Sequence, residues 1–174
     1  MSNYWNEAIA YGYLSDIGCQ NIKFIPRSRE NGHKTPDIMG YLDGQEIICE
    51  AKRVNRSDAE IKRRQDFSVG SGYPNVSAEL LAKIRNICKC AGSQISSYAK
   101  GRIVHRLVFL GIEFDDSVGD EAEQHAQQIE TYLQQCDFGD LNIVFRVDTL
   151  MYSEVIRVKS AISKTISDEV SCGP

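Results

Sequence analysis

The dipeptide Asp43-Gly44 constrains the fold of this chain more than any other pair of residues. Two runs rich in β-branched and apolar residues, Thr35–Leu42 and Gln45–Val54, flank it. Asp-Gly is a favoured pair for a two-residue type I′ turn, because both central positions of that turn need a positive φ. The sequence therefore predicts a β-hairpin, and a turn of this kind sets which residues of the two strands face each other.

Three charged residues of this hairpin are expected on one face. The turn places Asp37 opposite Glu50, and opposed residues project from the same face with Cβ atoms roughly 4.5–5.5 Å apart. Lys52, two residues beyond Glu50, projects from that face as well. Two opposed carboxylates are tolerated if a divalent cation such as Mg²⁺ lies between them, and a nearby ammonium group can stabilise charge on a phosphoryl oxygen. The pattern favours a metal-dependent phosphodiester hydrolase.

The same residues resemble a known nuclease signature. Pro36-Asp37, a gap of twelve residues and then Glu50-Ala51-Lys52 are similar to the PD-(D/E)xK motif of restriction endonucleases, Holliday-junction resolvases and related DNA enzymes. The resemblance implies that Asp37, Glu50 and Lys52 are catalytic. It also implies that Asp37, Glu50 and the backbone carbonyl of Ala51 hold Mg²⁺, for which Mn²⁺ is expected to substitute. The alternative is a surface hairpin with solvated charges, but the apolar run before Glu50 is typical of a central strand.

Two further residues are second-rank candidates for this site. Glu7 lies on an expected helix over Ser2–Ile17, and in the PD-(D/E)xK family the helix before the sheet often supplies another acidic residue. Its alternative role is to stabilise the first turn through the helix dipole. Gln94 and Tyr98 form a Gln-x-x-x-Tyr pair that resembles a motif of some exonuclease-like members, whereas the alternative for Gln94 is an ordinary helix surface. The expected apolar stripe of the first helix comprises Trp5, Ala8, Ile9 and Gly12.

Positive charge is concentrated directly after the motif. The chain has a net charge of −4 and a pI near 5.4, yet the segment from Lys52 to Arg64 has six basic residues against two acidic ones. A capping box, Ser57-x-x-Glu60, opens a charged helix there, followed by a glycine-containing loop. We interpret 57–76 as a basic insertion next to the site, with a solvated charge run as the alternative. The residues expected to contact the DNA backbone are Arg53, Arg56, Lys62, Arg63 and Arg64.

Length and composition predict one globular domain. The 174 residues contain 42% hydrophobic and 25% charged residues, which suits a single domain over 1–162 with a polar tail over 163–174. We expect no signal peptide and no membrane span. The six cysteines are scattered without zinc spacing, which favours reduced thiols in a cytoplasmic protein. An iron–sulfur cluster is not expected.

The order of expected elements is α-β-β-β-α-β-α-β. The last segment, Glu154–Ile162, is expected to be a strand or a helix. The first six elements match the αβββαβ order of the restriction-endonuclease-like core, so the expected fold is α/β, a central mixed sheet flanked by helices. The other expected elements are a strand at Asn21–Pro26, a helix from Ala78 to about Lys100, a strand at Ile103–Phe114, a helix from Asp120 to Cys136 and a strand at Leu141–Val147.

These patterns lead to a first hypothesis of a Mg²⁺-dependent nuclease that hydrolyses DNA phosphodiester bonds. A second is a catalytically inactive protein of the same fold that binds DNA or serves as a scaffold, and a third is cleavage of RNA by the same site. By analogy only, relatives that cut both strands suggest a homodimer. The sequence leaves open the form of the nucleic acid, its recognition sequence and whether a partner protein supplies targeting.

Overall fold

The turn at Asp43-Gly44 forms as predicted and joins two strands of a six-stranded sheet in the computed structural model. Asp43 and Gly44 have φ values of 51° and 78°, as a type I′ turn requires. Strands β2 (Ile38–Leu42) and β3 (Gln45–Val54) pair with Leu42 opposite Gln45 and Ile38 opposite Cys49. The predicted register of the hairpin is therefore confirmed. The structure describes residues 3–28, 34–54, 75–113, 120–148 and 153–159.

The sheet is mixed, and its strands lie side by side in chain order from β1 to β6. Strand β2 pairs antiparallel with both β1 and β3. Strand β4 pairs parallel with both β3 and β5. The last strand, β6, is antiparallel to β5. The predicted mixed α/β architecture is confirmed. The remaining described elements are α1 (Asn3–Asp16), β1 (Gln20–Phe24), α3 (Ala78–Ala99), β4 (His105–Glu113), α4 (Asp120–Gln135), β5 (Leu141–Asp148) and β6 (Ser153–Lys159).

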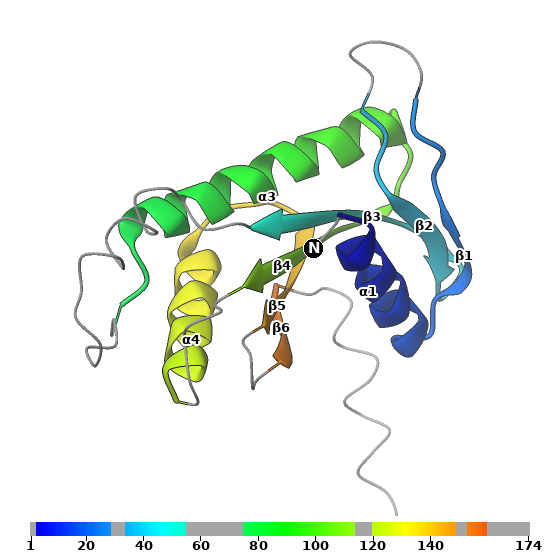
Figure 1. Cartoon of the computed structure of the whole chain (residues 1–174). Helices are drawn as coiled ribbons and strands as arrows, with labels where there is room; N and C mark the ends of the chain where they lie inside the picture. Colours follow the sequence, from blue (N-terminus) through cyan, green and yellow to red (C-terminus); the bar gives the residue numbers. More distant parts are fainter. Residues whose placement is uncertain (1–2, 29–33, 55–74, 114–119, 149–152, 160–174) are drawn as a thin grey trace, which may run out of the picture.

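Helices cover both faces of the sheet (Figure 1). Two consecutive parallel crossovers, through α3 and through α4, connect β3 to β4 and β4 to β5. Because such crossovers are right-handed, both helices lie on the same face. Their apolar stripes, including Ile84, Ile95 and Ile129, pack with Ile48 and Phe145 of the sheet in one core. On the other face α1 forms a second core with β2, β3, β4 and β5.

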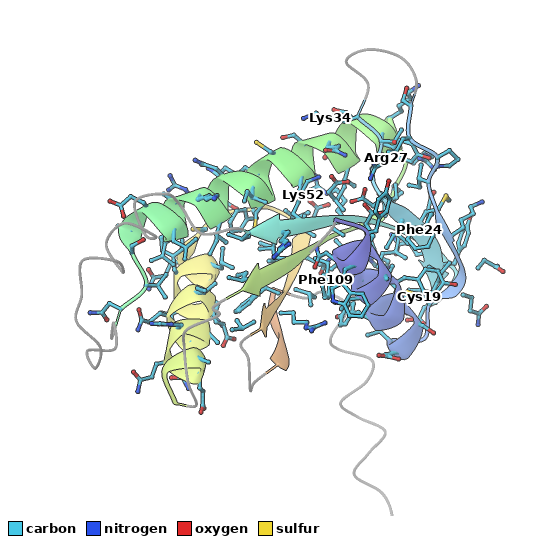
Figure 2. The ribbon with its side chains drawn as sticks, in the orientation of Figure 1. Cys19, Phe24, Arg27, Lys34, Lys52 and Phe109 are labelled. Atoms are coloured by element: carbon cyan, nitrogen blue, oxygen red, sulfur yellow. The ribbon has the colours of Figure 1, made fainter. Side chains whose placement is uncertain are left out.

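The buried face of α1 differs from the predicted one. Its buried residues are Asn6, Ala10 and Leu14, whereas Trp5 is 59% exposed. The stripe that packs on the sheet therefore lies about one residue further along the chain than the expected stripe through Trp5, Ala8, Ile9 and Gly12. The reason lies in β4, where Gly111 has no side chain: a Cβ there would collide with the Asn6 side chain. The close approach places Ala10 and Leu14 on the sheet. Tyr13 packs on Phe109, with ring centroids 5.7 Å apart; Figure 2 labels Phe109 beside α1.

The predicted strand over Thr35–Leu42 begins only at Ile38. Pro36 has no N–H to donate to β3, so the regular pairing of β2 with β3 starts only after this residue. The last described segment, which the sequence left open between strand and helix, is strand β6. Most of the predicted insertion at 57–76 and the tail at 163–174 lie outside the described residues. The same holds for four of the predicted DNA contacts, namely Arg56, Lys62, Arg63 and Arg64.

Within the described ranges, no helix combines the length and the apolar character needed to cross a membrane. The five described cysteines are free thiols. Cys19, Cys49 and Cys88 are buried, whereas Cys90 is exposed. Burial raises the pKa of Cys88 to about 12, so this thiol is a core residue rather than a nucleophile.

Candidate active site

The hairpin residues predicted to be catalytic lie in one cavity at the part of β3 that is remote from the turn. The cavity has a volume of about 490 Å³. Its walls come from α1, from the chain after β1 and before β2, from β3 and from α3. Figure 2 shows Arg27, Lys34 and Lys52 near α3 on this part of the molecule. The lining residues are Glu7, Arg27, Ser28, Lys34, Thr35, Asp37, Glu50, Ala51, Lys52, Arg53 and Gln94.

Asp37 is held at the point where the β2–β3 ladder ends. Its carboxylate oxygen Oδ2 accepts a hydrogen bond from the backbone N–H of Ala51 at 2.9 Å. Its own N–H donates to the carbonyl of Cys49 at 3.2 Å, and its carbonyl accepts from the N–H of Ile25 at 2.8 Å. Pro36 leaves the ladder incomplete, and the Asp37 side chain supplies the acceptor that Ala51 would otherwise lack. The carboxylate is thereby oriented before any ligand binds.

Glu50 is the most deeply buried charged residue of the cavity, with 1% of its side chain exposed. Its pKa is raised from 4.5 to about 7, chiefly by burial and also by the nearby Asp37 carboxylate, while the Lys52 ammonium and the Gln94 side chain act in the opposite direction. One carboxylate oxygen, Oε1, contacts the Lys52 ammonium. The other, Oε2, is buried and has no hydrogen-bond partner among the described residues. A buried carboxylate with an unsatisfied oxygen is costly unless another group binds it.

Lys52 lies beside Glu50 on β3, as the two-residue period of the strand predicts. Its ammonium contacts Glu50 Oε1, yet 39% of its side chain remains exposed. The side chain therefore joins the buried carboxylate to the open part of the cavity. A positive charge at this position can act on an anionic ligand as well as on Glu50.

Gln94 reaches this cavity from α3. Its side-chain amide Nε2 donates a hydrogen bond to the carbonyl of Thr35 at 2.9 Å. This bond ties the helix to the segment directly before Pro36 and Asp37. The residue therefore differs from an ordinary surface glutamine. Its predicted companion Tyr98 lies in the neighbouring groove, where the Arg102 guanidinium is 5.6 Å from the centre of its ring.

Glu7 also reaches the cavity, from the opposite face of the sheet. Its carboxylate accepts a hydrogen bond from Arg27 Nη2 at 3.2 Å, and its side chain is 14% exposed, against 68% for Arg27. The Arg27 guanidinium lies 5.4 Å from the centre of the Tyr4 ring. Glu7 is therefore paired with a basic residue, and it lines the same cavity as Asp37.

Sequence reasoning did not identify Arg27 and Thr35 as residues of the site. A usable signal was present in the proline positions. Pro26 lies two residues after the end of β1, and Pro36 directly precedes Asp37. Because β1 and β2 are antiparallel neighbours, the two ends of the intervening loop must lie together beside Asp37. Of the predicted DNA contacts, Arg53 lies in the cavity wall.

The donor set suits a hard divalent cation. The described residues contain no group of three or more His, Cys, Asp or Glu side chains placed to hold a metal ion. Asp37 and Glu50 nevertheless line one cavity, and Mg²⁺ needs only one or two carboxylates when water and phosphate complete its shell. The unsatisfied oxygen of Glu50 is an acceptor that a cation would satisfy. Asp37 and Glu50 therefore offer the oxygen donors that such a cation takes, and the metal role of these two residues and of the Ala51 carbonyl stays a prediction.

Searches with this chain found no matching protein-family model, no matching curated protein and no matching solved structure.

Proposed function

We propose that this chain is a Mg²⁺-dependent deoxyribonuclease that hydrolyses DNA phosphodiester bonds through a PD-(D/E)xK site. One observation carries the proposal. Asp37, Glu50 and Lys52 line a single open cavity, and the buried Glu50 carboxylate has an oxygen that no described residue satisfies. Charged groups are rarely gathered in this way for stability alone, since burying a carboxylate costs free energy.

The roles of the residues follow from their positions. Asp37, Glu50 and the carbonyl of Ala51 would hold Mg²⁺, which when bound acts as a Lewis acid and lowers the pKa of a water molecule. Lys52 presents its ammonium group to the open cavity, where it stabilises the negative charge that develops on the phosphoryl oxygens. The hydrogen bond from Gln94 to Thr35 holds the segment that carries Asp37.

The fold supports the same proposal. The described elements follow the order α1-β1-β2-β3-α3-β4, which agrees with the αβββαβ core that the resemblance implies. Antiparallel β1, β2 and β3 bring Asp37 to Glu50, and the parallel pairing of β3 with β4 returns the chain through α3. That return places Gln94 at the site. The finer assignment to a restriction-endonuclease-like core is part of this proposal.

Basic residues around the cavity suit a polyanionic substrate. Arg27, Lys34 and Arg53 line it together with Lys52. We propose that Arg53, Lys34 and the basic segment after β3 hold the sugar–phosphate backbone, which gives affinity without sequence information. Binding should therefore weaken as salt is raised.

The test is a nicking assay on supercoiled plasmid DNA with the purified full chain. Cleavage in Mg²⁺ or Mn²⁺ that stops in EDTA supports the nuclease. Binding of DNA without cleavage in either cation favours the inactive DNA-binding protein of the same fold. A labelled RNA of matching sequence, tested in parallel, separates ribonuclease from deoxyribonuclease activity.

A further inference from the structure

A second cavity opens beside the site on the side of α1 and has a different chemistry. Its volume is about 370 Å³, and its walls are Tyr4, Glu7, Phe24, Ile25, Arg27 and Asp37. Three of these residues, Glu7, Arg27 and Asp37, also line the candidate active site. The second cavity therefore adjoins the place where the phosphodiester is proposed to bind.

Aromatic side chains lie exposed at this cavity. Tyr4 is 68% exposed and Phe24 is 50% exposed. The Phe24 ring stacks on Tyr11 of α1, with centroids 5.5 Å apart and an angle of 23° between the rings. Figure 2 shows Phe24 and Arg27 beside α1. Two exposed aromatic side chains beside one cavity form an apolar surface that a flat group can cover.

Arg27 adds a planar cation to the aromatic wall. Its guanidinium lies 5.4 Å from the centre of the Tyr4 ring and is paired with Glu7. Unpaired nucleobases are typically bound by stacking on aromatic rings or on arginine guanidinium planes. A base paired in the interior of a duplex offers no free face for such stacking, because its neighbours cover both faces.

We propose that this second cavity holds an unpaired nucleobase next to the scissile phosphate, stacked between Phe24 and Arg27. The inference rests on the proposed nuclease function and extends it by naming the substrate class. The substrate would be a single strand, or a duplex end or junction that presents an unpaired nucleotide. Asp37, which lines both cavities, sets the base immediately beside the cleavage site.

The test measures binding rather than cleavage, in EDTA, with the full chain. The probes are a single-stranded oligonucleotide with one 2-aminopurine, the same strand in a blunt duplex, and a duplex with a short unpaired overhang that carries the 2-aminopurine. Phe24→Leu keeps an apolar side chain but removes the aromatic face, whereas Phe24→Tyr keeps that face. Tyr41→Ala is the matched control, because Tyr41 is an exposed aromatic residue, 40% accessible, that does not line the cavity.

We expect Phe24→Leu to weaken binding of both unpaired probes by roughly 5- to 100-fold and to remove the change in 2-aminopurine emission. Phe24→Tyr and Tyr41→Ala should bind like the wild type, and the blunt duplex should bind equally to all four proteins. Circular dichroism and thermal unfolding establish that Phe24→Leu is folded. If this variant does not fold, Arg27→Lys, which keeps the charge but loses the planar group, replaces it with the same expected loss.

Three results would overturn the inference. One is unchanged binding of the unpaired probes by folded Phe24→Leu, and another is an equal loss for Tyr41→Ala. The third is a dimer, seen by sedimentation, that Phe24→Leu abolishes without affecting the probes, because the aromatic surface would then bind a second copy of the chain. The nuclease proposal is judged separately. If the protein stacks the base but never cuts DNA, the base-binding role of this cavity stands and the proposed nuclease activity is wrong.

Discussion

The carboxylate oxygen Oδ2 of Asp37 accepts a hydrogen bond from the backbone N–H of Ala51 at 2.9 Å. A side chain therefore completes the hydrogen-bond ladder at the open end of the β2–β3 hairpin. The residue before it, Pro36, ends regular pairing of β2. The same carboxylate therefore supports the hairpin and lines the cavity where a cation is proposed to bind.

This dual role separates two substitutions of Asp37. Asp37→Asn keeps an oxygen that accepts the Ala51 N–H but loses the charge, so we expect a nearly unchanged free energy of unfolding in EDTA. Asp37→Ala leaves the N–H unsatisfied and should cost roughly 1 to 3 kcal/mol. Both should lose Mg²⁺ binding. Thermal unfolding with and without Mg²⁺ measures this, since a ligand at 100 times its Kd stabilises the wild type by about 2.7 kcal/mol. An unchanged Mg²⁺ titration for Asp37→Asn would remove Asp37 from the metal site.

Lys52→Ala should abolish cleavage while leaving the fold and most DNA binding intact. The ammonium is one of several basic groups on the cavity wall, so its loss costs little affinity. By stabilising the negative charge that develops on the phosphoryl oxygens, the ammonium group is expected to raise kcat by a factor of about 100 or more. Single-turnover cleavage and a filter-binding assay on the same DNA measure the two effects. Full activity of this variant would overturn the site assignment.

Burial of Glu50 predicts a stability that depends on pH. Its pKa is about 7 in the folded protein, against an ordinary value of 4.5. Between these values the folded state retains a proton that the unfolded chain has released, so the free energy of unfolding falls as pH rises. Glu50→Gln carries no ionisable group and avoids this cost.

In EDTA, Glu50→Gln should therefore match the wild type near pH 4.5 and exceed its stability by about 1 to 3 kcal/mol above pH 7. Urea unfolding at pH 5 and pH 8 measures the difference. Glu123→Gln, which changes an exposed carboxylate on α4, is the control and should show no such divergence. A Glu50→Gln protein that is less stable than the wild type at pH 8 would contradict the assigned burial cost.

Gln94→Ala should lower kcat about 10-fold through positioning. The substitution removes the hydrogen bond to the Thr35 carbonyl, and a small displacement of a catalytic group is costly in rate. Gln94 also lowers the pKa of Glu50, so its loss should move the acidic limb of the pH–rate profile to higher pH. Gln134→Ala, a glutamine of α4 bonded to Glu130, is the control. A lower rate with an unmoved profile would limit Gln94 to a structural role.

Several parts of this molecule could be predicted because the physics that sets them is local. The turn at Asp43-Gly44 needs only two residues that tolerate positive φ, and the register of Asp37 and Glu50 follows from it by counting. The buried face of α1 could not be predicted in this way, because Asn6 is buried over Gly111 of β4, a residue far away in the chain.

By itself, then, the sequence determined the hairpin, its register, the mixed α/β class and the triplet Asp37, Glu50 and Lys52. Tertiary structure alone decided that Glu50 is buried with one oxygen that no described residue satisfies, and that Gln94 and Arg27 reach the same cavity. The reason is the range of the interactions. Turn geometry and strand period act over a few residues, whereas burial and cavity walls depend on which distant segments the crossovers and the sheet bring together.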